Sequence, residues 1–224
     1  MLHEWWRKKL QQRRSRRFRR RLRIPEFAFL ADEELDNDEV YVSLDCETTG
    51  LNPKKDRIIT LSAVKIVGNR ILSSQKFTAM IDPQMTISEQ SIKIHHIRHA
   101  DLQACEVLTE RQALEAFLTF IGSATLIGYY LEFDLAMLDR LVKPWLGDSL
   151  PNPRIEVSEL FYQWRQQQSR DSMRNAHIDL RFDRMMDDLQ LPRFSQHDAF
   201  NDALMTAMAF VKLRSLLERE RAKR

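Results

Sequence analysis

The chain has few of the features that mark secreted or membrane proteins. Only two of its 224 residues are cysteines, which is too few for a disulfide framework and fits a reducing compartment. No apolar run approaches the roughly 20 residues that cross a bilayer, and the N-terminus lacks the apolar core of a secretory signal. Five glycines and seven prolines exclude collagen-like and low-complexity chains. We therefore expect a cytoplasmic protein with no transmembrane segment.

What the chain has instead is a very uneven distribution of charge. Residues 1–23 contain eleven basic residues and one acid, whereas the other 201 residues contain 24 basic and 31 acidic ones. A segment with a net charge of +10 is thus joined to a body with a net charge of −7. The basic segment predicts a polyanionic partner. The acidic body predicts a need for metal cations before a phosphate can approach.

The basic segment belongs to the first of two predicted parts. We place residues 1–38 in an N-terminal arm that ends in an acidic linker, and residues 39–224 in one folded domain. Tryptophan, leucine and phenylalanine interleave with the arginines of the arm at rough helical spacing. Nucleic acid, an anionic membrane surface and a protein are three partners that fit this pattern, and we favour nucleic acid.

The folded part follows an α/β pattern. Short β-branched and aromatic stretches predict strands at residues 40–44, 57–67, 70–81, 124–128 and 154–157. Helical spacing predicts helices that begin near residues 88, 109, 133, 158, 179 and 198. Pro144 is expected to stop the third of these at about residue 142. An antiparallel meander followed by alternating helix and strand predicts a mixed sheet.

Two carboxylates adjoin the first predicted strand. Residues two apart in a strand project to the same face, so Asp45 and Glu47 should lie side by side. Their charges repel each other and resist burial unless a cation lies between them. Hard oxygen ligands select Mg²⁺ or Mn²⁺. The other interpretation is a pair of solvated acids where a strand enters a loop.

Three later residues are candidates to complete such a site. Asp134 follows a predicted strand at the start of a helix, where α/β sheets gather ligands, although an acid there also suits the helix dipole. Asp202 lies one turn into the last helix and could equally belong to a solvated face. His197 converges with it only if the helix begins near Asp198, a good capping residue. The positive helix end would then keep His197 neutral, as a general base must be.

Three segments in this order resemble the DEDDh exonucleases, the family of the proofreading epsilon subunit of bacterial DNA polymerase III and of ribonuclease T. Residues 44–51 (Leu-Asp-Cys-Glu-Thr-Thr-Gly-Leu) are similar to its first motif. Residues 128–134 are similar to its second motif and residues 197–203 to its third. The resemblance spans about residues 40–212 and implies a ribonuclease H-like fold, in which helices flank a mixed five-stranded sheet.

The resemblance also implies a 3′→5′ exonuclease that releases nucleoside 5′-monophosphates with the help of two divalent cations, Mg²⁺ or Mn²⁺. The implied metal ligands are four carboxylates, which match the charge of two such cations: Asp45, Glu47, Asp134 and Asp202. His197 would take the proton from the attacking water.

Substrate contacts are implied by the same resemblance. Thr48, Thr49 and Leu51 should lie beside the 3′-terminal nucleotide, and His95 should lie near the substrate. The threonines would also form a Thr-Thr-Gly turn without any substrate. Tyr130 is expected either to stack on a base or to pack in the core.

The chain departs from the family pattern at several positions. Tyr129 and the tyrosine after it stand where His-Asn is usual. His96 replaces a glycine, and Arg98 replaces a threonine. Glu156 and the valine after it replace an Asp-Thr pair. These departures concern the substrate more than the metal.

The leading hypothesis is therefore a 3′→5′ exonuclease of single-stranded or frayed DNA, which acts alone or beside a polymerase. An exoribonuclease or oligoribonuclease would use the same site chemistry. A nucleic-acid-binding module with a silent nuclease fold is the alternative from another class. Loss of a metal acid would favour that alternative, and none is lost.

Overall fold

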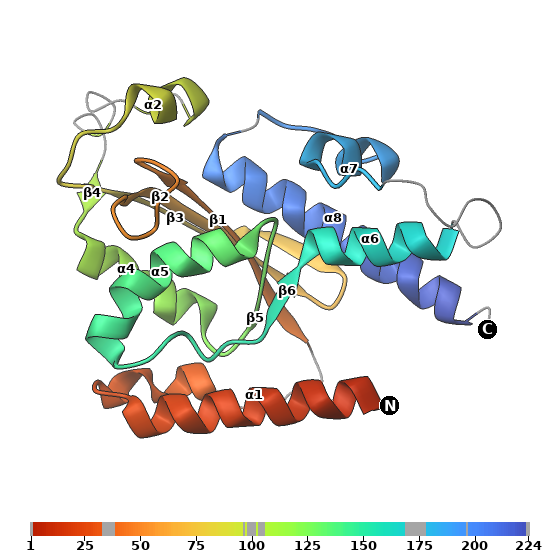
Figure 1. Ribbon diagram of the computed structural model, residues 1–224, viewed down its shortest axis with the longest axis horizontal. Helices are drawn as coiled ribbons and strands as arrows, with labels where there is room; N and C mark the ends of the chain where they lie inside the picture. The colour runs from red at the N-terminus through yellow and green to blue at the C-terminus, as the bar shows by residue number, and fades with distance from the viewer. Residues whose placement is uncertain are drawn as a thin grey trace.

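The computed structural model describes residues 2–32, 39–95, 97, 102, 106–168, 178–195 and 197–222. It contains a six-stranded mixed sheet with the strand order β4-β3-β2-β1-β5-β6 (Figure 1). The strands are β1 (Val40–Thr48), β2 (Ile58–Val67), β3 (Arg70–Ile81), β4 (Val107–Leu108), β5 (Thr125–Gly128) and β6 (Arg154–Glu156). The α/β fold with a mixed sheet that the sequence predicts is thus confirmed.

The sheet is built around β1. β1 pairs with β2 and β2 with β3 in the predicted antiparallel meander. β5 joins β1 in parallel on its other side, and β6 joins β5. The predicted count of five strands is one too low, because β4 has only two residues and shows no period in the sequence.

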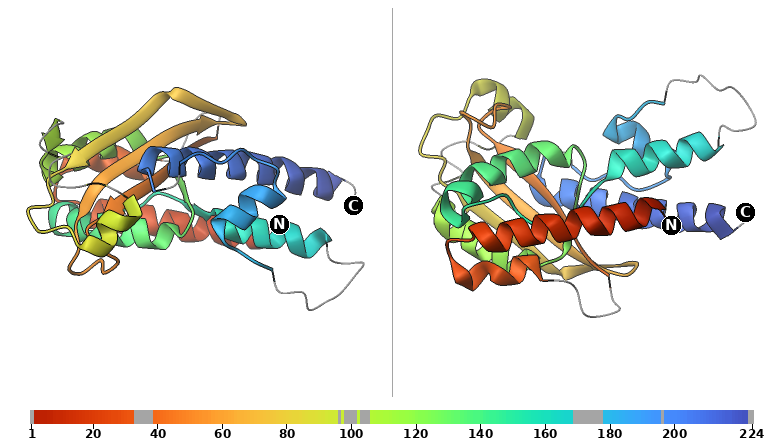
Figure 2. Two further views of the ribbon diagram at one scale, coloured as in Figure 1. Left: turned by 90° about the horizontal axis from the view of Figure 1, so that it is seen from above. Right: turned by 60° about the horizontal axis from the view of Figure 1, so that its bottom comes forward.

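Helices cover both faces of this sheet (Figures 1 and 2). The chain begins with α1 (Leu2–Arg21) and the 3-10 helix η1 (Pro25–Ala31). The other helices are α2 (Glu89–His95), α4 (Glu110–Ile121), α5 (Leu131–Leu146), α6 (Val157–Gln168), α7 (Phe182–Asp188) and α8 (Ala199–Ala222). One apolar cluster joins α4 and α5 to one face of the sheet, and a second joins α6, α7 and α8 to the other.

Helix α5 is longer than its sequence suggests. The sequence predicts that Pro144 stops it at about residue 142, but the helix continues to Leu146 with the proline inside its last turn. A proline so close to the end removes one backbone hydrogen bond. Leu146 is fully buried, and its burial favours the added turn. Gly147 then ends the helix with a φ of 96°.

The basic N-terminal helix packs against the rest of the protein. Phe18 of α1 is buried in the same cluster as α4 and α5. The amide of Arg23 donates a hydrogen bond to the carbonyl of Leu146 at 2.9 Å, and the side chain of Gln11 donates one to the carbonyl of Pro151 at 2.7 Å. In the described part of the chain, no helix combines the length and the hydropathy that crossing a bilayer requires.

Candidate functional site

The candidate site lies at the carboxyl end of β1, on the face that α8 covers. Alternate residues of β1 point toward α8. The ring of Tyr41 lies 4.8 Å from that of Phe210, and the Ser43 hydroxyl donates a hydrogen bond to a backbone carbonyl of α8 at 2.8 Å. Asp45 and Glu47 continue this alternation, so their carboxylates face the start of α8.

Three carboxylates meet at this place. One oxygen from each of Asp45, Glu47 and Asp202 lies within 4.8 Å of the other two. Glu47 is only 8% exposed, and no basic side chain of the described residues forms an ion pair with any of the three. Uncompensated like charges predict a bound cation, and a set of donors that contains only oxygen suits Mg²⁺ or Mn²⁺. The three residues, here called the carboxylate group, therefore fit a divalent metal ion.

Crowding of these acids changes their protonation. Burial, together with the charges of Asp134 and Asp202, raises the pKa of Asp45 well above its usual range. Burial and the charge of Asp202 raise the pKa of Glu47 to about 7. Burial also raises the pKa of Asp202, although a hydrogen bond from the His197 amide opposes this rise. Without a cation, the site therefore retains protons near neutral pH.

We expect the protein without metal to lose stability as the pH rises from 4.5 to about 7. The lower limit is the pKa of Glu47 in the unfolded chain, and the upper limit is its pKa in the folded protein. An acid with the higher pKa in the folded state binds a proton on folding. Below the unfolded pKa the acid is protonated in both states and does not reduce the stability. Above the folded pKa it is ionised in both states, and the fold then bears the full free-energy cost of the buried charge. Mg²⁺ should raise the melting temperature more at high pH, because metal ligands must be deprotonated.

Differential scanning calorimetry in EDTA and in excess Mg²⁺, from about pH 5 to about pH 8, measures this dependence. The matched variant is Glu47→Gln, in which the part of the pH dependence that belongs to this residue should vanish. A wild-type protein whose response to Mg²⁺ does not grow with pH would contradict a metal site made of these acids.

Asp134 lies in the first turn of α5 and is also buried. Its Oδ1 accepts a hydrogen bond from the backbone amide of Cys46 at 3.0 Å, which ties α5 to β1 between Asp45 and Glu47. Burial raises the pKa of Asp134 to about 7, and the hydrogen bond from Cys46 opposes the rise. Asp134 thus lies beside the carboxylate group without belonging to it. Its role as a metal ligand stays a prediction.

His197 lies in the loop, as its spacing from Asp202 requires. Asp198 caps α8 by accepting a hydrogen bond from an amide of the first turn at 2.9 Å. His197 has a φ of 63°, and its amide donates a hydrogen bond to Asp202 Oδ2 at 2.8 Å. His197, Asp202 and Asp45 line one cavity of about 360 Å³. The geometry therefore brings the predicted base to the predicted metal ligands.

The same cavity contains residues that the sequence did not single out. Phe182 and Asp183 come from the start of α7, and Thr206 lies one turn after Asp202 in α8. Thr206 could have been selected, because residues four apart share one face of a helix. Phe182 and Asp183 carry no such signal, since only the folding of the chain returns α7 to the site.

The residues predicted beside the 3′-terminal nucleotide differ in exposure. Thr48 and Thr49 are buried. The Thr48 hydroxyl donates a hydrogen bond to the carbonyl of Gly50 at 2.7 Å, and that of Thr49 donates one to Asp56 at 3.2 Å. Leu51 is 80% exposed in the same turn. The threonines therefore shape the turn, and Leu51 presents a side chain to any ligand beside it.

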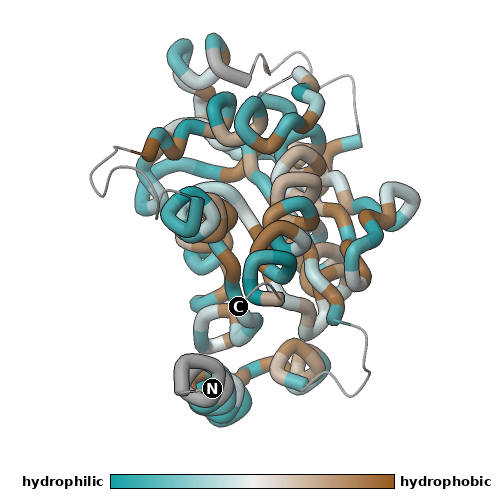
Figure 3. The backbone as a smooth tube through the Cα atoms, turned by 90° about the vertical axis from the view of Figure 1, so that its right-hand side faces the viewer, coloured by the Kyte–Doolittle hydropathy of each residue, from teal (hydrophilic) through white to brown (hydrophobic). Residues whose placement is uncertain are grey.

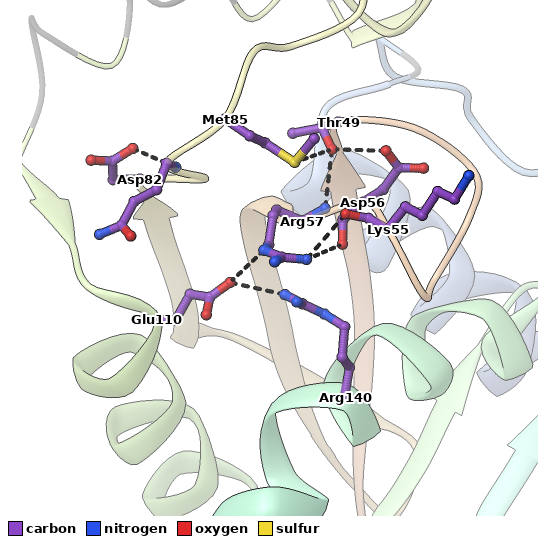
Figure 4. A network of polar contacts seen from close by, with 9 residues as sticks. Thr49, Lys55, Asp56, Arg57, Asp82, Met85, Glu110 and Arg140 are labelled. Carbon is purple, nitrogen blue, oxygen red and sulfur yellow. Dashed lines mark hydrogen bonds and ion pairs between the residues drawn. The ribbon is translucent and has the colours of Figure 1, made fainter.

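A polar network holds this turn in place (Figure 4). The amide of Arg57 donates a hydrogen bond to the Thr49 hydroxyl at 3.0 Å. The Arg57 guanidinium lies 3.7 Å from Glu110, and the same carboxylate oxygen accepts a hydrogen bond from Arg140 at 2.9 Å. These contacts link the turn to α4 and α5, so Leu51 is positioned before any substrate arrives.

The two tyrosines that replace the family pattern take different positions. Tyr129 donates a hydrogen bond to a backbone carbonyl at 2.9 Å and packs against Phe182. Tyr130 is 63% exposed, with a φ of 56°. Glu156 accepts hydrogen bonds from two successive amides, of Tyr130 and the next residue, at 3.1 and 2.9 Å. Glu156 thus caps α5, Tyr129 packs at the edge of the core, and Tyr130 faces solvent.

The predictions for the histidines and the arginine around the end of α2 are not tested by the structure. His95 is the last residue of α2, and its contact with substrate stays a prediction. His96 and Arg98 lie outside the described residues.

Comparison with known proteins identifies the family to which the chain is similar. The family model described as exonuclease matches residues 42–210. The chain is 29% identical over 195 residues to the PolC-type DNA polymerase III of Thermotoga maritima, with 87% of this chain and 13% of that protein covered. It is 26% identical over 176 residues to the DNA polymerase III subunit epsilon of Aquifex aeolicus, with 79% and 81% covered. The chain spans about one eighth of the PolC-type relatives.

Solved structures confirm the architecture. The structure of E. coli exonuclease I in complex with a dT13 oligonucleotide has a TM-score of 0.66 at 14% identity, with 83% of this chain and 43% of that chain covered. Cell-death related nuclease 4 has a TM-score of 0.63 at 14% identity, with 80% and 64% covered. At such low identity the likeness concerns the fold alone, and the fold is the predicted ribonuclease H-like one.

Proposed function

Since this chain belongs to the exonuclease family, whose members are 3′→5′ enzymes, we propose that it releases nucleoside 5′-monophosphates from the 3′ ends of single-stranded DNA. The observation that carries this proposal is the carboxylate group at the end of β1, which occupies motif positions of the family. A polymerase is the proposed partner, because the relatives of this chain include DNA polymerase III subunits.

The carboxylate group would hold the metal, with Asp134 as a fourth ligand. When bound, two divalent cations, Mg²⁺ or Mn²⁺, would supply charge stabilisation to the attacking and leaving oxygens of the phosphodiester. The raised pKa values of Asp45 and Glu47 support this assignment, because burial and the charges of neighbouring carboxylates both disfavour their ionised forms unless a cation is bound. The same negative charges would repel a phosphate if they were not neutralised.

His197 is the proposed general base. It lines the cavity beside Asp45 and Asp202, and it is exposed, so its imidazole can exchange protons with solvent. The backbone amide of His197, and not its side chain, donates the hydrogen bond to Asp202. The imidazole is therefore not needed to position this metal ligand. Leu51 and Tyr130, both exposed, are proposed to contact bases by packing and stacking.

The test compares DNA and RNA strands of one sequence, labelled at the 5′ end and incubated with the protein and Mg²⁺. We expect a ladder that shortens one nucleotide at a time from the 3′ end, faster on DNA than on RNA, and no ladder in EDTA. A faster ladder on RNA would change the proposed substrate to RNA. The absence of a ladder on both strands, with Mg²⁺ and with Mn²⁺, would refute the exonuclease and favour a silent binding module.

A further inference from the structure

Helix α1 carries a row of arginines that no acid of the described chain neutralises. Arg13, Arg16 and Arg20 are three and four residues apart, so they lie on one face of the helix. All three are exposed, and none forms an ion pair with a described residue. We call these three residues the arginine stripe. Together with Arg17 and Arg21 they line a hollow of about 430 Å³, and the described residues around it are all arginines.

Helix α1 is anchored to the protein both beside the stripe and on its opposite side. The Arg17 guanidinium lies 2.8 Å from the buried carboxylate of Asp148, and Phe18 is 1% exposed. Gly147, which ends α5, packs so closely on the end of α1 that a Cβ there would collide with the Arg21 carbonyl oxygen. These contacts hold the stripe at a fixed place on the surface, so α1 is not a free tether.

A fixed row of like charges is a ready binding surface for an anion. Like charges three or four residues apart on a helix repel each other, and a docked helix cannot relieve this by moving away. Burial is the main cause that lowers the pKa of Arg14, and the charges of Arg154 and Arg17 act in the same direction, so further positive charge lies beside the stripe. The guanidinium fork matches the geometry of phosphate oxygens.

We propose that the arginine stripe binds the phosphate backbone of the nucleic-acid strand whose 3′ end is processed at the carboxylate group. This proposal rests on the proposed function. α1 lies below the amino end of β1, whereas the carboxylate group lies at its carboxyl end (Figure 1). Asp45 and Glu47 are five and seven residues after the first residue of β1, or roughly 17 to 23 Å at about 3.3 Å per residue. The width of α1 adds about 10 Å. At about 3.4 Å per nucleotide, a stacked strand needs about nine nucleotides to contact both, and an extended strand needs fewer.

Nucleic acid fits this surface better than a membrane does. A helix that lies in a bilayer interface needs an exposed apolar face. Among the side chains of α1 that the structure describes, Phe18 faces the protein, and Leu10, 58% exposed, is the one large apolar residue open to solvent. In Figure 3 the coloured turns of α1 are mainly teal, which marks hydrophilic residues. Over the described side chains of α1, from Lys9 to Arg21, the stripe therefore offers charge with a single exposed apolar residue, Leu10.

The experiment measures binding of fluorescent single-stranded DNA by anisotropy in Mg²⁺ over a series of salt concentrations. All proteins compared carry His197→Asn, which should slow hydrolysis while metal binding persists. Strands of about three and about thirty nucleotides lie on either side of the required length. The test variant changes the three stripe arginines to glutamine. The matched control removes the same charge from exposed positions of α8 and contains Lys212→Gln, Arg219→Gln and Arg221→Gln.

The stripe variant should bind the long strand at least about tenfold more weakly, with the slope of log K against log salt reduced by about two, because each single-strand phosphate contact contributes about 0.7. Binding of the short strand, the α8 control and the melting temperature should not change. If the triple variant unfolds, Arg16→Gln alone should reduce the slope by about 0.7.

An unchanged salt slope for the long strand in the stripe variant would overturn the proposal. An equal loss of affinity in the α8 control would also overturn it, because the net charge of the protein, and not the stripe, would then explain the binding. Stripe-dependent binding to vesicles of anionic lipid that exceeds binding to the strand would assign the surface to membranes. Failure of the proposed function has a different signature, which is that the protein with His197 intact releases no mononucleotides in Mg²⁺ from the short strand, a substrate too short to reach the stripe.

Discussion

The Asp45→Asn variant is expected to lose at least about a thousandfold of the Mg²⁺-dependent release of mononucleotides, because metal ions contribute several kcal/mol to such a transition state. The amide keeps the shape of the side chain but is a poor ligand for a cation. It also removes one charge from a group whose oxygens lie within 4.8 Å of one another. Without metal, the variant should therefore be more stable than the wild type, by about 1 kcal/mol or about 2–4 °C in melting temperature.

Single-turnover assays and calorimetry in EDTA test the two halves of this expectation. A suitable control is Asp187→Asn, which changes an exposed acid of α7 that pairs with Arg193 away from the cavity. It should keep its activity and its melting temperature. Full activity in purified, metal-loaded Asp45→Asn protein would remove the carboxylate group from the chemistry. Loss of activity together with loss of stability would instead indicate damage to the fold.

The parts of this site that depend on the two-residue alternation of a strand or on the capping of a helix were predictable from the sequence. The alternation along a strand assigns Asp45 and Glu47 to one face, and both do point toward α8. A capping residue at Asp198 fixes where α8 begins, which puts His197 in the loop and lets it approach the first turn. In both cases, a few consecutive residues determine the geometry.

Contacts between distant segments could not be obtained in this way. The position of Asp134 after β5 predicts that it lies near the site, but not that its carboxylate turns to the amide of Cys46. Asp183 reaches the cavity only because α7 folds back on it. The basic charge of α1 indicates a polyanion partner, yet the docking of the helix depends on Phe18 and on the space left by Gly147. Such features follow from packing, which no single stretch of sequence specifies.

The His197→Asn variant is expected to slow the chemical step by about a hundredfold to ten-thousandfold, the usual contribution of a general base. Metal binding should persist, because the backbone amide of His197, and not its imidazole, contacts Asp202. Asparagine is preferred over alanine because the residue has a φ of 63°, which asparagine tolerates better. Part of the lost rate should return at high pH, where hydroxide replaces the base.

Two measurements on the same protein separate the base from a ligand. The single-turnover rate reports the chemical step, and the rise in melting temperature on adding Mg²⁺ reports metal binding. Glu47→Gln provides the contrast, since removal of a ligand should reduce both. If His197→Asn also loses the response to Mg²⁺, the imidazole acts as a ligand or holds the loop in place. If its rate at saturating Mg²⁺ equals that of the wild type, another group accepts the proton, and the position of His197 on the cavity wall has no role in catalysis.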